Sequence, residues 1–182
     1  MIRRIFIGTA LVTLTLCSMT PRIDATASKG GGPSIATFEG TLIDLRDGWG
    51  EARACTTDGV TTACFRTELE LDDYLVDVAD IVQTIVGGLS LQVVCATQLR
   101  LYANTSFGGS MLSLTTRGVL FNLSGWSFDN ITSSYKVGAC NSTFYDGANA
   151  GAPIYPGSTT AGTWASTMVA GWDNRVSSVI VS

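Results

Sequence analysis

The sequence has no histidine and few charged side chains. Of its 182 residues, 14% are charged, and the formal net charge is −4 at pH 7. The absence of histidine excludes Ser-His-Asp and Cys-His nucleophilic catalysis, histidine zinc ligands and histidine proton shuttles. The acidic balance lacks the basic surface that nucleic-acid binding requires, so we expect no nucleic-acid partner.

Motifs of several enzyme classes are missing as well. The sequence has no C-x-x-C pair, no glycine-rich phosphate loop and no G-x-S-x-G segment, which argues against zinc, thioredoxin-like, nucleotide-binding and α/β-hydrolase chemistry. The acidic residues after residue 93 are Asp129, Asp146 and Asp173. Two of them lie in the repeated loops described below, which leaves no acid–base pair for a glycosidase. We therefore expect a protein without catalytic activity.

The N-terminal residues have the order of a secretory signal peptide. Arg3 and Arg4 precede an apolar run over 5–17, and Ala25-Thr26-Ala27 is an A-x-A cleavage site. This order predicts a signal peptide over 1–27. Because the apolar run is too short for a comfortable membrane span, we expect a secreted, extracellular mature chain without a membrane-spanning segment.

Four cysteines remain once the signal peptide, with Cys17, is removed. An even number of cysteines in an exported chain favours disulfide bonds over metal ligation. The sequence alone allows three pairings, and we favour Cys55–Cys64 because these two flank a predicted hairpin turn at Asp58-Gly59. A two-residue turn would offset the cysteines diagonally, whereas a four-residue turn over 58–61 would place them opposite each other.

Between residues 28 and 92 the sequence predicts an N-terminal segment with a flexible leader, a strand over 35–45, the hairpin and one helix. The helix is expected from Thr67 to about Val86, because Thr67 and Glu70 form a capping box and apolar residues recur at helical spacing. Its acidic residues are read as a solvated outer face. The segment is either a cap on the following domain or a separate module, and no function follows from it.

The C-terminal ninety residues contain a degenerate duplication. Asp129-Asn130-Ile131-Thr132-Ser133-Ser134 and Asp173-Asn174-Arg175-Val176-Ser177-Ser178 share the pattern D-N-x-x-S-S, and each leads into a strand-like run. We call 129–134 the first clamp and 173–178 the second clamp. Carboxylate, amide and hydroxyl oxygens are the ligands that calcium takes, although the same residues are also ordinary turn formers. Their recurrence at matching positions favours a cation site.

The stretch from about Val94 to Val181 resembles a βγ-crystallin domain. Tyr102, Phe107 and Gly109 fit the first signature of that family, an aromatic, four residues, an aromatic, one residue and a glycine. Both clamps fit its second signature, [ND]-[ND]-x-x-[ST]-S, which is typical of microbial calcium-binding members. The resemblance implies a mainly β fold, a sandwich of two Greek-key motifs over 93–182.

The resemblance also implies calcium ligands. They are the side chains of Asp129 and Ser133 with the carbonyl of Ile131, and the side chains of Asp173 and Ser177 with the carbonyl of Arg175. Ligands would be exchanged between the two copies, and carbonyls near Asn104 and Asp146 would complete the shells.

Two departures from the family pattern weaken the second copy. In the hairpin of the second copy, residues 144–151, Asn149 stands where the family has an aromatic residue. Arg175 brings a positive charge that should lower the calcium affinity of the second clamp. The resemblance supports a Cys95–Cys140 disulfide, since both cysteines open their motifs at nearly equivalent positions. Trp126 and Trp172, each just before a clamp, are expected to be core aromatics.

We therefore expect a secreted, non-catalytic, monomeric protein whose fold is stabilised by calcium. The alternative is a binding protein on the same fold, because some small secreted proteins that it resembles are metalloproteinase inhibitors or antimicrobial toxins. The candidate inhibitory loop is Ala150–Gly162, which carries Pro153 and Pro156. The corresponding partner would be an extracellular protease or a cell-surface molecule.

Overall fold

The computed structural model describes residues 34–86 and 94–182. The predicted signal peptide and nearly all of the leader lie outside these ranges. The prediction of a mainly β fold is confirmed. Among the described residues, no helix is long and apolar enough to cross a membrane.

Along the chain, the described ranges contain strands of 2 to 11 residues and a single α-helix. They are β1 (Ile35–Phe38), β2 (Thr41–Asp44), β3 (Ala54–Thr57), β4 (Thr62–Phe65), α1 (Glu68–Val86), β5 (Val94–Asn104), β6 (Gly108–Thr116), β7 (Leu120–Asn122), β8 (Ser134–Lys136), β9 (Ser142–Gly147), β10 (Gly151–Ile154), β11 (Trp164–Ala165) and β12 (Ser178–Val181). Short 3₁₀ turns occur at Leu45–Asp47, Thr105–Phe107 and Leu123–Trp126.

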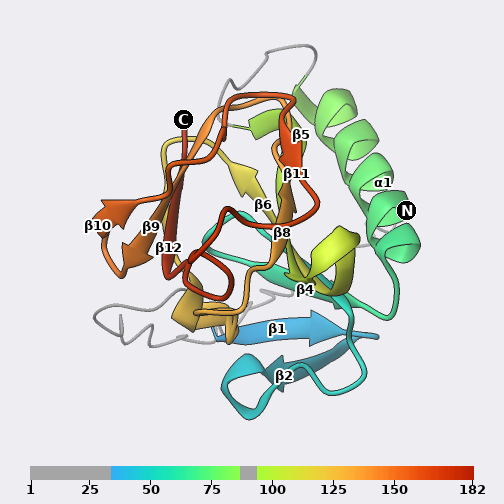
Figure 1. Ribbon diagram of the computed structural model, residues 1–182. Helices are drawn as coiled ribbons and strands as arrows, with labels where there is room; N and C mark the ends of the chain where they lie inside the picture. The colour runs from blue at the N-terminus through green and yellow to red at the C-terminus, as the bar shows by residue number, and fades with distance from the viewer. Residues whose placement is uncertain (1–33, 87–93) are drawn as a thin grey trace, which may run out of the picture.

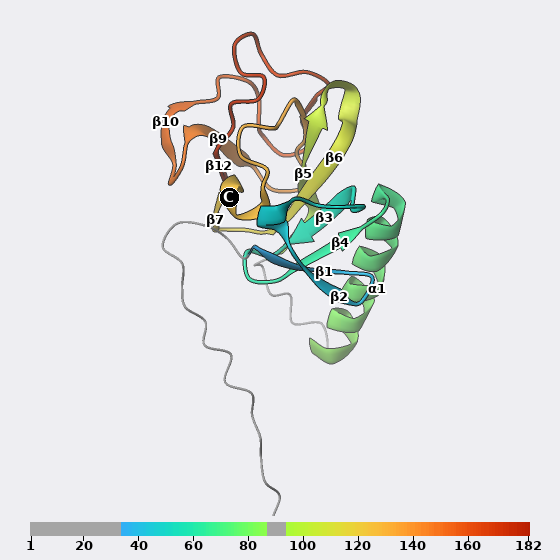
Figure 2. The ribbon, with the colours of Figure 1, turned by 90° about the horizontal axis from the view of Figure 1, so that it is seen from below.

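The strands form two sheets that face each other (Figure 1). The larger has the order β11-β8-β5-β6-β3-β4-β1-β2, and the smaller has the order β10-β9-β12-β7. In both Figure 1 and Figure 2 the large sheet lies between the small sheet and α1. The molecule therefore has three layers, with a core on each side of the large sheet.

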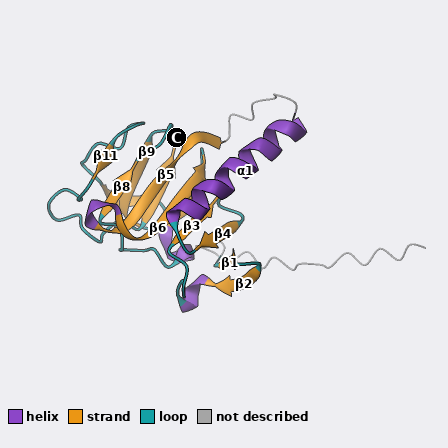
Figure 3. Ribbon diagram, turned by 90° about the vertical axis from the view of Figure 1, so that its right-hand side faces the viewer, coloured by secondary structure: helices purple, strands orange, loops and turns teal. Residues whose placement is uncertain are grey.

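Side chains alternate between these two cores along the central strands, as the two-residue period of a strand requires. On β5, Leu101 belongs to the core between the sheets, whereas the next residue, Tyr102, belongs to the smaller core under α1. On β6, Leu112 faces the small sheet and Met111 faces the helix. Leu71 of α1 completes the smaller core and is fully buried, and Figure 3 shows the helix lying across this face of the sheet.

The helix α1 begins where the sequence predicts. The Oγ1 atom of Thr67 accepts a hydrogen bond from the backbone N–H of Glu70 at 3.1 Å, and the Glu70 carboxylate accepts one from the N–H of Arg66 at 2.9 Å. Arg100 of β5 forms ion pairs with Glu68 and Asp72 on the sheet side of α1, so the expectation of a solvated outer face is wrong for these two acidic residues. These pairs are partly shielded from water, so they fix the helix on the sheet more firmly than exposed pairs would.

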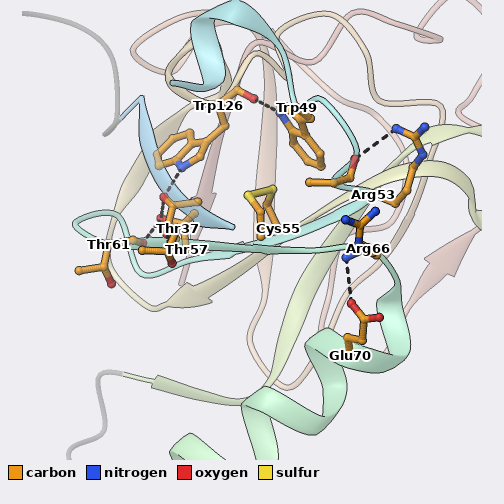
Figure 4. Close-up of a disulfide and its surroundings, with 12 residues drawn as sticks. Thr37, Trp49, Arg53, Cys55, Thr57, Thr61, Arg66, Glu70 and Trp126 are labelled. Atoms are coloured by element: carbon orange, nitrogen blue, oxygen red, sulfur yellow. Dashed lines mark hydrogen bonds between the residues drawn. A yellow bond between two sulfur atoms is a disulfide. The ribbon is translucent and has the colours of Figure 1, made fainter. Parts of the chain in front are cut away.

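Strands β3 and β4 form the predicted hairpin with a four-residue turn. Cys55 lies directly opposite Cys64 in the strand register, and the two are joined by a disulfide bond (Figure 4). The Asp58 carboxylate accepts hydrogen bonds from the N–H groups of Val60 and Thr61, which closes the turn. The four-residue alternative is therefore confirmed. A second disulfide joins Cys95 to Cys140.

The prediction of one continuous strand over 35–45 is wrong. Residues 35–44 form a hairpin, in which β1 and β2 pair antiparallel around Glu39 and Gly40. Both turn residues have positive φ, 49° and 76°, as a two-residue turn of type I′ requires. A glutamate in this conformation is uncommon, and the alternating pattern on both sides hid the reversal.

The strands before residue 93 belong to the same sheet as the strands after it. β3 pairs in parallel with β6, with Cys55 opposite Leu112, and β4 pairs in parallel with β1. The N-terminal strands thus extend the large sheet beyond β6 (Figure 2). Of the two arrangements that the sequence allowed for this segment, the structure has it packed on the rest of the chain.

Candidate metal centre

The two clamps lie side by side and are locked together by backbone hydrogen bonds. The first clamp leads into β8, and the second leads into β12. The N–H of Asn130 donates to the carbonyl of Val176, and the N–H of Asn174 donates to the carbonyl of Thr132, both at 3.1 Å. Asn130 and Asn174 both adopt the left-handed conformation, with φ of 57° and 56°. The two loops are thus related by an approximate two-fold symmetry.

The second serine of each clamp holds a folded hairpin in place. The hydroxyl of Ser134 donates to the carbonyl of Asn104 at 2.6 Å and accepts from the N–H of Phe107 at 3.0 Å. The hydroxyl of Ser178 makes the same pair of bonds with Gly147 and Ala150, at 2.6 and 3.0 Å. Both serine side chains are fully buried. These serines therefore have a structural role and no free oxygen for a metal.

The symmetry corrects the alignment of the second hairpin. The N–H of Ser133 donates to the carbonyl of Tyr102, and the N–H of Ser177 donates to the carbonyl of Tyr145, both at 2.9 Å. Tyr145 is thus the counterpart of Tyr102, and Ala150 is the counterpart of Phe107. From the sequence, Asn149 is expected at the aromatic position, five residues after Phe144. This expectation is wrong by one residue, because the position lies five residues after Tyr145 and is occupied by Ala150.

The first serine of each clamp points toward the other clamp. The Oγ of Ser133 lies 3.2 Å from the Oδ1 of Asn174, and the Oγ of Ser177 lies 3.3 Å from the Oδ1 of Asn130. Each pair brings a hydroxyl and an amide oxygen from different motifs to one place. Oxygens of this kind are the hard, neutral donors found in calcium sites.

The carboxylates of the clamps differ in their surroundings. The Oδ1 atom of Asp129 is buried and makes no hydrogen bond to any described residue, while its Oδ2 atom accepts a bond of 3.3 Å from the Asn130 amide. A buried carboxylate oxygen without a partner is costly unless a cation or water satisfies it. Asp173 is exposed, and its carboxylate accepts a bond of 3.4 Å from the Asn174 amide. The first clamp therefore fits a cation better than the second.

Arg175 is anchored beside the second clamp. Its guanidinium donates to both carboxylate oxygens of Asp146, at 3.2 and 2.5 Å, and to the carbonyl of Gly171 at 2.8 Å. It also lies over the ring of Trp172, with 5.2 Å to the ring centroid. The Asp146 carboxylate is thus already paired with a positive charge. The hydrogen bond from Arg175 lowers the pKa of Asp146 below its ordinary value.

The chemistry available here is coordination by oxygen. The described residues contain no group of three or more His, Cys, Asp or Glu side chains that could hold a metal ion. A cation at the clamps would therefore be held by one carboxylate, hydroxyls, amides and backbone carbonyls, which suits calcium at moderate affinity. Trp126 and Trp172 are buried and belong to the larger core, in agreement with the expectation of core aromatics.

The structure adds two residues to those expected from the sequence. Asn130 and Asn174 are the side chains that meet Ser177 and Ser133 across the symmetry axis. The D-N pair in both copies was a visible signal, but the exchange of partners between loops is a property of the fold. The contacts of the Ile131 and Arg175 carbonyls with a cation stay predictions.

The chain is similar to βγ-crystallin domains over about half its length. A βγ-crystallin from Ciona intestinalis is 23% identical, with a TM-score of 0.40 over 47% of this chain and 99% of its own. A βγ-crystallin from an archaeon is 22% identical, with a TM-score of 0.38 over 48% of this chain and 99% of its own. A clostrillin double mutant in complex with nickel is 15% identical, with a TM-score of 0.37 over 47% of this chain and 98% of its own. No protein-family profile and no curated protein matches the sequence.

Proposed function

We propose that this chain is a secreted, non-catalytic protein that binds calcium at its two clamps and is stabilised by the metal. The observation that carries the proposal is the reciprocal meeting of Ser133 with Asn174 and of Ser177 with Asn130. The buried, unpartnered Oδ1 of Asp129, in the same clamp as Ser133, adds a negatively charged oxygen. Two disulfides among the described residues support an extracellular location.

The ligands in this proposal are oxygens of both clamps. The side chains of Asp129, Ser133, Asp173 and Ser177 and the carbonyls of Ile131 and Arg175 form the expected set, and the Asn130 and Asn174 amides join it. Because Arg175 already neutralises Asp146, the second site binds more weakly than the first.

Calcium titration calorimetry on the oxidised, chelator-treated protein tests the proposal. A site with a Kd of roughly 100 μM in millimolar calcium stabilises the native state by about 1.4 kcal/mol, which corresponds to a rise in Tm of about 3–6 °C. The variants S133R and S177R should each remove one site, because each places a cation at a pair of ligands. The variant S124R, at an exposed serine outside the clamps, is the control.

The outcome that sinks the proposal is the absence of both signals. If calcium releases no heat and does not change the Tm of the wild type, the clamps are turns and nothing more. If the wild type binds calcium but S133R and S177R keep its full stoichiometry, the ligand assignment is wrong.

A second candidate function, inhibition of an extracellular metalloproteinase, is favoured by one observation. Ile154 has 57% of its surface exposed, and it lies between Pro153 and the buried Tyr155. Tyr155 is anchored by a backbone bond of 2.9 Å to Phe144 and by packing against its ring. The loop thus presents an apolar side chain from a fixed support, as a protease inhibitor requires.

An activity assay with a thermolysin-like protease separates this candidate from the first. Inhibition at micromolar protein that is lost in I154D, but kept in the surface control L120D, supports it. Leu120 is also exposed and apolar but lies on β7. Full protease activity in the presence of the wild type removes the inhibitor function and leaves the calcium proposal untouched.

A further inference from the structure

Residues from the N-terminal segment contact the chain immediately before the first clamp. The indole N–H of Trp49 donates to the carbonyl of Trp126 at 2.7 Å (Figure 4). The hydroxyl of Ser127 donates to the carbonyl of Leu45 at 2.5 Å. The rings of Trp49 and Phe128 pack with centroids 5.5 Å apart. Residues 45–49, which we call the brace, thus hold the three residues that precede Asp129.

The brace and the residue that it bonds, Trp126, are each held by further contacts. Leu45 is fully buried, and its N–H donates to the carbonyl of Ser34 at 2.6 Å. On the other side, the indole N–H of Trp126 donates to the Oγ1 of Thr62 at 2.9 Å. Thr62 opens the strand that carries Cys64 of the first disulfide, so the support reaches the cross-linked hairpin.

The segment that the brace holds has an unfavourable backbone conformation. Ser127 has φ of 51° and is left-handed although it is not glycine, a conformation that costs free energy and persists where the surroundings fix it. The brace bonds Ser127 itself and the residue before it, Trp126, and the ring of Trp49 packs against the residue after it, Phe128. The direction in which the chain enters the first clamp is set here.

The second clamp has a different support. The residue before it, Trp172, donates its backbone N–H to Val169 and packs against Tyr155 with ring centroids 5.3 Å apart. Its indole ring also lies under the guanidinium of Arg175. All of these partners belong to the second motif. The two clamps are therefore alike in their own residues and unlike in what holds them.

We infer that the brace is part of the first calcium site: Trp49 is a positioning residue that sets the affinity of the first clamp and leaves the second nearly unaffected. This rests on the proposed calcium function. Asp129 follows the braced residues directly and supplies a charged ligand, so its displacement weakens the first site most. Asn130 contributes a neutral oxygen to the second site, and its own N–H bond to Val176 keeps it in place.

The test measures each site separately. The S177A background leaves the first site, and the S133A background leaves the second. W49F keeps an aromatic ring against Phe128 and removes the donated hydrogen bond, so calcium affinity at the first site should fall about fivefold, with less than a twofold change at the second. S127A, which removes the other bond of the brace, should act in the same direction. W164F is the matched control, because Trp164 is 66% exposed and outside both clamps.

A purely structural role for Trp49 would lower the Tm in chelator without changing one site more than the other. Equal losses at both sites, or no loss at either in W49F and S127A, overturn the inference. Absence of calcium binding by the wild type overturns the proposed function instead, so the two failures are distinguishable. All titrations are made at a temperature at which thermal unfolding shows each variant to be folded.

Discussion

Adjacent serines in the first clamp should respond in opposite ways to replacement by alanine. The hydroxyl of Ser134 is fully buried and bridges the carbonyl of Asn104 and the N–H of Phe107. In S134A the N–H loses its partner inside the protein, which costs about 1–3 kcal/mol. For a chain of this length that corresponds to a fall in Tm of about 2–12 °C. The response to calcium should remain.

Among the described residues, the Ser133 hydroxyl makes one hydrogen bond, of 3.2 Å, to the Asn174 amide oxygen. Because Asn174 is exposed, water replaces the lost hydroxyl in S133A, and the cost in metal-free protein should stay below about 1 kcal/mol. Its calcium-dependent stabilisation should instead be reduced, since the hydroxyl is a proposed ligand.

Thermal unfolding in chelator and in millimolar calcium separates the two effects. S134A should lower both Tm values together, and S133A should lower mainly the value in calcium. The pair S177A and S178A in the second clamp repeats the comparison, since Ser178 makes the equivalent bonds. If S133A keeps the full calcium response while S134A loses it, the roles given to the two serines are wrong.

Three further outcomes follow from electrostatics, chain topology and burial. The variant R175Q should raise calcium affinity at the second site about three- to tenfold, because it removes a cation and frees the Asp146 carboxylate. Calcium titration in the S133A background measures this affinity, and weaker binding than in S133A alone would contradict the prediction. Removal of the Cys95–Cys140 disulfide, which closes a loop of 45 residues, should lower the free energy of unfolding, measured in urea, by about 4 kcal/mol. Removal of Cys55–Cys64, with a separation of 9, should lower it by less. The reverse order would refute the argument that the longer closed loop gives the larger stabilisation. Burial and the bond to a helix carboxylate raise the pKa of Tyr102, so its contribution to stability is complete below a pH of about 10 and is lost as the pH rises further. Denaturant unfolding against pH should therefore decline less steeply in Y102F, and identical slopes would show that the phenol plays no part.

The elements that were predictable from the sequence are those with local chemical signals. Thr67 and Glu70 mark the start of α1, and Asp58 with two flanking cysteines marks the β3–β4 hairpin. The turn at Glu39-Gly40 gave no such signal, because glutamate rarely adopts positive φ. The parallel pairing of β3 with β6 joins residues far apart in the chain and leaves no mark on either strand.

The candidate site was located by its repeat, but its internal roles were not visible. The pattern D-N-x-x-S-S gives two consecutive serines, and only the hairpins folded against Ser134 and Ser178 show that these two are structural. The partnership of each asparagine with the opposite loop, and the bond of Trp49 to Trp126, depend on symmetry and long-range packing. Such contacts lie beyond any pattern within one segment.

The position of β3 also determines how this protein can be divided. β6 is a long strand with fully buried Leu112 and Leu114, and β3 covers its outer edge in parallel register. A fragment that begins at residue 93 would present that edge, with its unpaired N–H and carbonyl groups, to other copies of itself. The β3–β4 hairpin thus covers an edge that would otherwise be free to pair with other copies of the chain.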